Sequence, residues 1–326
     1  MLRIGLSTLI TVVCCSLLCP LTLAFARKFK AGQPILGYVT NHYSKSGTPT
    51  MGGTAFLCAS CLVAIFFNFS YSRLAIISAV TVLGFGVIGF LDDYIKVKGK
   101  DNKGLSVIQK LIGQFILAGI VAYFVYTQTS VGGVIEVPFF DVKFDIGRWA
   151  IPVYAIFIVG IVNFVNLTDG LDGLVATTGC VSAVALSIII FLTTLSSGTK
   201  NGELIGLSAF SMSFGFALAT FYVLNSYPAK IFMGDTGSLG TGALLATISL
   251  FSGNMLTFMV IGVVYILSGV SVILQVGYYK LTHKRIFKMA PFHHHLERCG
   301  IHENKIVAIY ALITLCCAIA VISLRG

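Results

Sequence analysis

The chain has very few charged residues for its length. Only 10% of its 326 residues are Asp, Glu, Lys or Arg, whereas soluble domains average about 25%. With 56% hydrophobic residues and a mean hydropathy of +0.93, this composition excludes a soluble globular protein. Eight of the nine cysteines fall in apolar runs, including the one CxxC pair, Cys58 and Cys61, which argues against a disulfide framework.

Long apolar runs take the place of the missing charge. A membrane-spanning helix needs about 20 mainly apolar residues. About ten such runs are present, at roughly 4–26, 52–69, 74–91, 106–127, 149–165, 174–195, 204–224, 238–252, 256–280 and 306–324. The sequence therefore predicts an all-α polytopic membrane protein that forms one integral membrane domain over residues 1–326.

Lys and Arg are unequally distributed between alternate loops. Ala24-Phe25-Ala26 resembles a signal-peptide cleavage site, but more basic residues follow it than precede it, namely Arg27, Lys28 and Lys30 against Arg3. This asymmetry favours a first helix with the N-terminus outside. About fifteen basic residues then lie in inner loops and about six in outer loops, which predicts both termini outside. Topology thus explains the net charge of +10 without nucleic acid.

One outer loop, residues 129–148, is long enough to hold structure of its own. Apolar and polar side chains alternate in Val134-Ile135-Glu136-Val137 and again in Asp141-Val142-Lys143-Phe144-Asp145, with Gly132-Gly133 and Pro138 beside them. This period of two predicts a small β-hairpin on the outer face.

The acidic residues gather in the inner loops. Eight of the twelve Asp and Glu fall on that side, and five of the eight abut helix ends in three different loops: Asp92, Asp93, Asp169, Asp172 and Asp235. One acidic turn would be ordinary turn chemistry, but independent turns would not be expected to collect on one face. Ionisable residues at the ends of membrane-length helices indicate a functional site.

Carboxylates mixed with lysines at a membrane boundary suit a phosphate-handling metal site. Mg²⁺ prefers a few carboxylate oxygens and completes its shell with water and substrate phosphates. Lys45, Lys96 and Lys110, with glycine-rich main chain near Gly234, would hold the remaining phosphate charge. The residues therefore indicate a Mg²⁺-dependent phosphate or pyrophosphate site facing the cytoplasm. An ion-coupled transporter is the alternative, although its acids would more naturally lie near mid-span.

Three successive histidines, His293, His294 and His295, stand in the last inner loop. On a helix their side chains point about 100° apart, so they cannot all ligate one metal. At most two of them would face a pocket, and the favoured interpretation is a substrate-contacting loop.

Five motifs together carry a resemblance to a known family. In chain order they are Gly47-Thr48-Pro49-Thr50-Met51-Gly52-Gly53, Asp92-Asp93-Tyr94, Asn166-Leu167-Thr168-Asp169-Gly170-Leu171-Asp172-Gly173, Phe232-Met233-Gly234-Asp235-Thr236-Gly237-Ser238 and Pro291-Phe292-His293-His294-His295. The chain resembles the phospho-N-acetylmuramoyl-pentapeptide transferases, within the wider polyprenyl-phosphate N-acetylhexosamine-1-phosphate transferase superfamily. The motifs run from the first inner loop to the last. The histidine motif resembles the muramoyl-pentapeptide branch, whereas N-acetylglucosamine relatives space it differently.

The resemblance implies a reaction and its partners. In a bacterial cytoplasmic membrane, undecaprenyl phosphate would accept phospho-N-acetylmuramoyl-pentapeptide from UDP-N-acetylmuramoyl-pentapeptide, giving lipid I and UMP for peptidoglycan synthesis. The site would lie on the cytoplasmic face and use Mg²⁺. An N-acetylglucosamine-1-phosphate transferase of the same superfamily is the alternative within this class. Membrane enzymes of this kind often pair, which makes a homodimer one arrangement to test.

The resemblance also implies roles for individual acids. Asp235 resembles the family's Mg²⁺ ligand. Asp92 and Asp93 resemble the pair assigned to the lipid phosphate, as base or metal-side carboxylates, and the three are the predicted catalytic residues. Asp169 and Asp172 match third-loop site residues, with Asp172 near the nucleoside.

The remaining roles concern substrate binding. Phe232 would stack on uracil, with Asn225 nearby and Asn166 in the third loop. Lys45, Thr50 and Lys96 would contact phosphates or ribose, and Gln275 with His294 or His295 would meet the sugar side. The rest of the predicted substrate-binding set is Lys110, Gly234 and His293.

The chemistry of the acceptor favours direct attack. A phosphate monoester has a second pKa near about 6, so much of a lipid phosphate is already a dianion at neutral pH. A general base then has little to do, which favours attack by the lipid phosphate itself over a covalent aspartyl intermediate.

Overall fold

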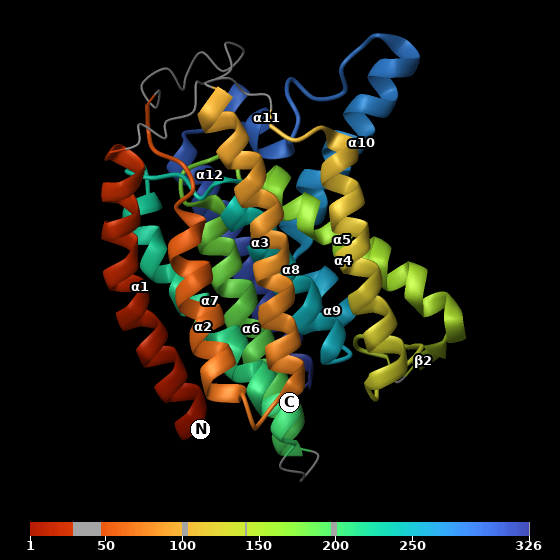
Figure 1. Cartoon of the computed structure of the whole chain (residues 1–326). Coiled ribbons are helices and arrows are strands. Elements are labelled where there is room, and N and C mark those ends of the chain that lie inside the picture. Colours follow the sequence, from red (N-terminus) through yellow and green to blue (C-terminus); the bar gives the residue numbers. More distant parts are fainter. Residues whose placement is uncertain (29–46, 100–103, 141, 197–200, 326) are drawn as a thin grey trace.

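The computed structural model describes residues 1–28, 47–99, 104–140, 142–196 and 201–325. These residues form a mostly helical bundle (Figure 1). The elements are α1 (Leu2–Lys28), α2 (Gly53–Asn68), α3 (Arg73–Gly99), α4 (Val107–Gln128), β1 (Val134–Val137), β2 (Val142–Asp145), the 3₁₀ turn η2 (Gly147–Trp149), α5 (Ala150–Thr168), α6 (Leu174–Ser196), α7 (Gly202–Asn225), α8 (Gly234–Phe251), α9 (Met255–Ile261), α10 (Val263–Thr282), α11 (Phe292–Arg298) and α12 (Glu303–Arg325).

Eight segments of the described chain are long and apolar enough to cross a membrane. They are α1, α3, α4, residues 147–168 with α5, α6, α7, α10 and α12. Every apolar run expected from the sequence contains a helix, but α2 is only 16 residues long. Helix α8 is rich in Gly, Ser and Thr, and every residue from Thr236 to Phe251 is buried. The chain is therefore a multi-pass helical protein of the predicted class.

The run 256–280, expected as one span, is instead two helices. Helix α9 ends at Ile261 and α10 begins at Val263, with Gly262 between them. The Gly262 N–H donates to the Phe258 carbonyl at 2.7 Å, and the backbone then leaves the helical conformation. A Cβ at Gly262 would lie 3.0 Å from the Phe258 ring. The expectation of one continuous helix was wrong because a glycine at this tight contact lets the chain change direction.

The predicted hairpin is confirmed as a two-stranded antiparallel sheet. Strand β1 pairs with β2 from Val134 opposite Asp145 to Val137 opposite Val142. The Tyr154 hydroxyl of α5 donates to the Gly132 carbonyl at 3.1 Å, which ties the hairpin to the bundle. In Figure 1 the hairpin and both chain ends lie toward the lower end of the bundle, opposite α11.

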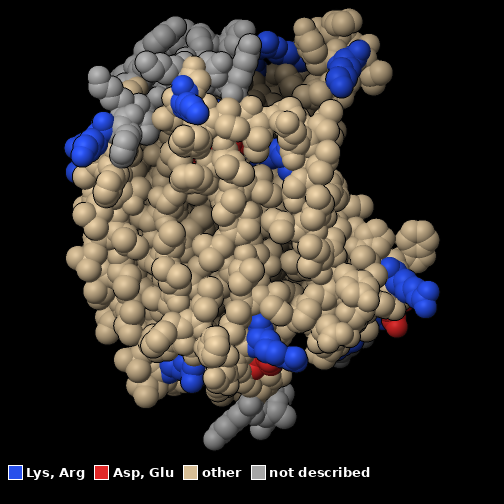
Figure 2. Space-filling view, viewed as in Figure 1, with Lys and Arg blue, Asp and Glu red and all other residues tan. Residues whose placement is uncertain are grey.

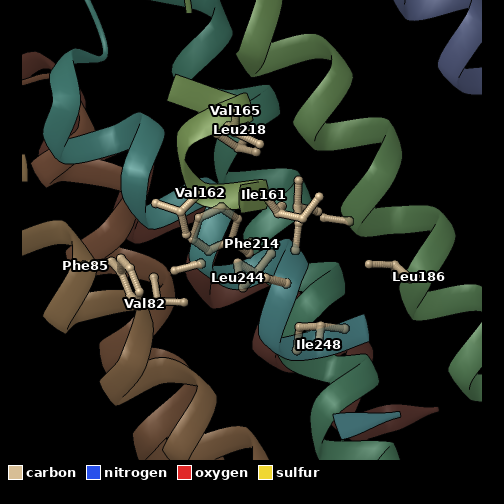
Figure 3. Close-up of a cluster of buried hydrophobic side chains, with 14 of the residues drawn as sticks. Val82, Phe85, Ile161, Val162, Val165, Leu186, Phe214, Leu218, Leu244 and Ile248 are labelled. Carbon is tan, nitrogen blue, oxygen red and sulfur yellow. The ribbon is translucent and has the colours of Figure 1, made fainter. Parts of the chain in front are cut away.

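Helix α8 forms the centre of the bundle and packs against α2, α3 and α5. Figure 3 shows Leu244 and Ile248 of α8 among buried side chains that include Phe85 of α3 and Phe214 of α7. At its N-terminal end the main chains themselves meet. A Cβ at Gly89 of α3 would overlap the carbonyl of Asp235. This close approach brings the two acids that follow Gly89 on α3 beside the first turn of α8.

A methyl group at Gly89 should disturb this approach. We expect Gly89→Ala to destabilise the protein by about 1–3 kcal/mol, the usual cost of overpacking, because α3 must move away from Asp235. Gly160→Ala on α5 is the matched control, since a Cβ there meets nothing within 4 Å. Thermal unfolding in detergent measures both variants, and equal melting temperatures would contradict the proposed contact.

Candidate active site

Three carboxylates meet where α3 and α8 approach each other. Asp92 and Asp93 lie on the last turns of α3, and Asp235 lies in the first turn of α8. One oxygen from each of the three lies within 4.8 Å of the others. The sequence prediction that acids from different loops converge is thus met for these three residues. An all-oxygen donor set of this kind suits a hard divalent cation.

Two lysines are built into the same cluster. The Lys96 ammonium lies 2.5 Å from Asp92 Oδ2 and 3.2 Å from Asp235 Oδ2, because residues four apart on α3 share one face. Lys110 lies 2.5 Å from Asp235 Oδ2. It stands in the first turn of α4, which Ser106 starts with a reciprocal capping box to Gln109. Three carboxylates against two ammonium groups leave the cluster with excess negative charge.

Asp93 differs from its neighbours in what it contacts. Its carboxylate is fully buried and accepts the N–H groups of Asp235 and Thr236 at 3.1 and 3.0 Å, and the Thr236 hydroxyl at 2.7 Å. It therefore caps the N-terminus of α8 from another helix, where a negative charge is favourable. Asp93 positions Asp235, and its oxygens are already occupied by protein donors.

Asp92 and Asp235 are also oriented by polar neighbours. Asp92 Oδ1 accepts the Leu105 N–H at 2.8 Å. Asn166, at the end of α5, donates to Asp235 Oδ1 at 2.9 Å and contacts the Ser238 hydroxyl at 2.8 Å. The cluster therefore joins α3, α4, α5 and α8. The acids are largely hidden from the surface, and the charged side chains visible at this upper end of the molecule in Figure 2 are mainly basic.

The loops that precede α2 and α8 pair beside the cluster. The Phe232 N–H donates to the Pro49 carbonyl at 2.7 Å, and the Phe232 carbonyl accepts the Gly52 N–H at 2.9 Å. The Phe232 side chain stays partly exposed. Thr50 is buried, and its hydroxyl lies 2.9 Å from where a Cβ of Gly234 would stand. Lys45, predicted to bind phosphate, lies outside the described residues.

Comparison of the sequence with known proteins matches the chain to one family. Residues 74–253 match the family described as glycosyl transferase family 4, and residues 45–57 match signature 1 of phospho-N-acetylmuramoyl-pentapeptide-transferase. A phospho-N-acetylmuramoyl-pentapeptide-transferase of Clostridioides difficile (strain 630) is 39% identical over 298 residues, 90% of this chain and 89% of the relative. Another, of Bacillus anthracis (strain A0248), is 40% identical over 312 residues, 94% and 91% of the two chains.

The chain belongs to the phospho-N-acetylmuramoyl-pentapeptide transferase family. The family match over residues 74–253 contains all five acids that were singled out in the sequence, from Asp92 to Asp235. The signature match contains Thr50. Both matches thus include residues that the structure brings together.

The second acid of the third loop is turned toward protein partners. Asp172 Oδ2 accepts the Ala229 N–H at 2.9 Å, and the Asp172 N–H donates to Glu303 at 2.6 Å. Glu303 is buried at the start of α12 and was not singled out in the sequence. Its signal was a lone acid at the head of the last apolar run. These contacts join the third and fourth loops to α12.

Two predicted substrate-binding amides hold loops together. Asn225 accepts the Gly173 N–H at 3.1 Å and donates to the Ile231 carbonyl at 3.0 Å. Gln275 accepts the Ile286 and Phe287 N–H groups and donates to the Phe287 carbonyl. Their polar atoms are therefore engaged by main-chain groups in this structure.

Two of the three histidines of α11, His293 and His294, lie together with ring centroids 4.4 Å apart, whereas His295 faces other partners. His293 is fully buried, and His293 and His294 both lie against Gly170 of the third loop, where a Cβ would collide with them. His294 Nδ1 contacts Glu297 at 3.0 Å, whereas His295 Nδ1 accepts the Lys288 N–H at 3.2 Å. Burial lowers the pKa of His293 well below its usual range, so this ring stays neutral at pH 7.

Asp169 lies between α5 and α6, and the pKa of its carboxyl group is strongly raised. Burial, and then the neighbouring charges of Asp235, Asp93 and Asp172, raise the pKa of Asp169 to about 8. The folded protein therefore keeps a proton on Asp169 that the unfolded chain loses near pH 4. The contribution of this residue becomes increasingly destabilising as pH rises from about 4 to about 8.

Asp169→Asn should remove this dependence. Without divalent metal, we expect the variant to melt at a higher temperature than the parent protein at pH 8, with the difference shrinking toward pH 5. Thermal unfolding in detergent between pH 5 and 8 measures it. A difference that does not change with pH would contradict the raised pKa.

Proposed function

We propose that the protein transfers phospho-N-acetylmuramoyl-pentapeptide from UDP-N-acetylmuramoyl-pentapeptide to undecaprenyl phosphate, giving lipid I and UMP. The observation that carries this proposal is the cluster of Asp92, Asp93 and Asp235 with Lys96 and Lys110 at the ends of long apolar helices. A soluble anionic donor and a membrane-bound anionic acceptor can meet only at such a boundary. The relatives named for this activity match nearly the whole chain.

Mg²⁺ is the proposed cofactor, and the donor set fits it. The cluster offers oxygens from three acids and keeps excess negative charge beside its two lysines. Asp92 and Asp235 would hold the ion, because their Oδ2 atoms face lysine side chains, whereas both oxygens of Asp93 accept main-chain N–H groups at the start of α8. When bound, the ion would neutralise phosphate charge, which is the main requirement of phosphoryl transfer.

Each lysine has a role in the same proposal. Lys96 and Lys110 each contact both Asp92 and Asp235. With substrate bound, their ammonium groups would pair with phosphate oxygens of the donor or the acceptor. Phe232, partly exposed beside the fourth loop, is proposed to stack on uracil. His294 lies against Gly170 of the loop between α5 and α6 and is proposed to meet the sugar, with Asp172 of that loop near the nucleoside.

The proposed orientation places this site on the cytoplasmic face of a bacterial membrane. Ten crossings arise if α2 and α8 each cross once and α9 with α10 cross together. An even number of crossings agrees with both chain ends lying toward one end of the bundle (Figure 1). The excess of Lys and Arg in the inner loops assigns the site end to the cytoplasm.

We propose direct attack by the lipid phosphate on the sugar-bearing phosphorus. An oxygen of the lipid phosphate forms a bond to the sugar-bearing phosphorus of the donor. The bond from that phosphorus to the phosphate oxygen of UMP breaks, and UMP leaves with the negative charge on that oxygen. Because the acceptor is largely a dianion at neutral pH, Asp92 serves positioning and charge balance. A phospho-sugar adduct trapped on Asp92→Asn protein, or UMP exchange without lipid, would overturn direct attack.

The test of the function is UMP release from purified protein in detergent. We expect release from UDP-N-acetylmuramoyl-pentapeptide that requires both undecaprenyl phosphate and Mg²⁺. Release from UDP-N-acetylglucosamine instead would move the protein to the sibling branch of the superfamily. No release from either donor, by a folded sample, would reject the transferase and favour the transporter.

A further inference from the structure

The C-terminal half of α10 and the residues that follow it stand clear of the bundle. Every residue from Ile273 to Ile286 is exposed except Gln275. Figure 1 shows this part of the chain leading away from the other helices at the upper right, before the chain returns to α11. We refer to residues 273–288 as the tip segment.

The tip segment changes character along its length. Its first part carries the exposed apolar side chains of Ile273, Leu274 and Val276, and the side chain of the intervening Gln275 is turned to the main chain of Ile286 and Phe287. Exposed apolar side chains of this kind favour apolar surroundings. Tyr278 and Tyr279 come next, and tyrosine is enriched where hydrocarbon meets headgroups. The segment then becomes strongly basic, with Lys280, Lys284, Arg285 and Lys288 all exposed. This order is that of a helix passing from hydrocarbon into lipid headgroups.

The charge of the tip segment is of one sign. Between Asp235 and Glu297 the sequence contains no Asp or Glu. Four cations on a short exposed segment beside a membrane helix are complementary to anionic headgroups, and each cation near such a surface strengthens the attraction.

The tip segment is held in a fixed shape. His283 adopts a left-handed conformation with φ of 54°, which turns the chain back at the end of α10. The Gln275 side chain then accepts the N–H groups of Ile286 and Phe287 at 3.1 and 2.9 Å, and it donates to the Phe287 carbonyl at 3.2 Å. The basic residues are therefore presented at one place and not on a freely moving loop.

The same segment is joined to the histidines of the candidate active site. The Lys288 N–H donates to His295 Nδ1 at 3.2 Å, and the Phe287 ring contacts the rings of Phe292 and His295 at 5.8 and 5.6 Å between centroids. Helix α11 continues from these contacts to His293, which lies against Gly170. An interaction that holds the tip segment in place would therefore also hold α11 in place.

We propose that the tip segment binds the headgroups of anionic phospholipids and thereby holds α11 beside the third loop. Its apolar part lies in the hydrocarbon, its tyrosines at the boundary, and its four cations among the headgroup phosphates. The phosphate of the acceptor lipid offers similar chemistry, but the proposed ligand of the tip segment is the bulk anionic phospholipid. The lipid binding does not depend on the proposed transferase function. The effect on α11 does rest on that proposed function.

Lipid selectivity tests the binding directly. The protein is reconstituted in phosphatidylcholine vesicles without polyprenyl phosphate, and spin-labelled phosphatidylglycerol is compared with spin-labelled phosphatidylcholine for the fraction immobilised by the protein. We expect a preference for phosphatidylglycerol of about twofold or more that weakens with added salt. Absence of a preference would overturn the proposal.

Matched variants locate the binding. Lys284→Gln with Arg285→Gln removes two tip cations, and we expect it to lose at least about half of the preference, since the attraction scales with the number of cations. Lys143→Gln with Arg148→Gln removes two cations near the hairpin and should leave the preference unchanged. A tip variant that retains the full preference, or a hairpin variant that loses it equally, would overturn the assignment to this segment.

UMP release tests the coupling to α11. We expect the parent protein to turn over faster in vesicles that contain one phosphatidylglycerol in about four lipids than in phosphatidylcholine alone, and the tip variant to lose this difference. Equal rates in both vesicles, with lipid selectivity intact, would overturn the coupling. An inactive protein that still selects phosphatidylglycerol would reject the transferase function and leave the lipid site standing.

Discussion

Asp235→Asn should lower the rate of UMP release by about a hundredfold or more, the usual cost of removing one preorganised charge contact in an active site. Asp235 is the residue on which Lys96, Lys110 and Asn166 all converge, at 3.2, 2.5 and 2.9 Å. The amide keeps the shape of the side chain but removes its charge. Two ammonium groups would then face Asp92 alone, and the proposed metal site would lose a ligand.

The measurement for Asp235→Asn is steady-state UMP release at saturating donor and a series of Mg²⁺ concentrations. Asp145→Asn in the hairpin is the control, because it changes the same charge far from the cluster while its role is a local turn contact with the Gly147 N–H. Activity of Asp235→Asn within tenfold of the parent protein would remove Asp235 from the proposed machinery.

Asp93→Ala should damage stability as well as activity, which would separate it from Asp92. Its carboxylate accepts three hydrogen bonds from Asp235 and Thr236 at the N-terminus of α8. Their loss leaves buried donors without partners, and we expect a cost of about 2–4 kcal/mol in unfolding free energy. Asp92→Ala should cost clearly less, because Asp92 accepts one main-chain N–H and otherwise contacts the lysines.

Thermal unfolding in detergent, run on both alanine variants beside an assay of UMP release, distinguishes these roles. Both variants should be impaired in turnover, but only Asp93→Ala should show a large drop in melting temperature. Equal melting temperatures for the two variants would mean that Asp93 does not hold α8 in place.

Much of this arrangement follows from local patterns in the sequence. The hairpin was predictable because the period of two in residues 134–137 and 142–145 is a local signal, and the strands end where that pattern ends. The meeting of Asp92, Asp93 and Asp235 was predictable because charge is too costly at membrane depth to be scattered without a purpose.

Other features depend on contacts that a sequence pattern does not reveal. The break at Gly262 lies inside a uniformly apolar run, where an isolated glycine is usually tolerated. The side chains of Asn225 and Gln275 accept main-chain N–H groups of other turns, and no pattern in the sequence indicates these contacts. The capping of α8 by Asp93 joins residues more than a hundred positions apart, so only the folded chain brings it about.

The composition of α8 has a consequence for how the protein is made. Its polar side chains find partners on other helices, as when Thr247 meets the Ser78 hydroxyl at 2.7 Å and Ser238 meets Asn166. In lipid without these partners, the polar groups would be unpaired and the glycines would add little apolar surface, so insertion of α8 alone would be unfavourable. We therefore expect α8 to insert into the bilayer during synthesis only by packing against α3 and α5. Asp235, which completes the acid cluster, lies on α8. The site would therefore form only after α8 has packed into the bundle.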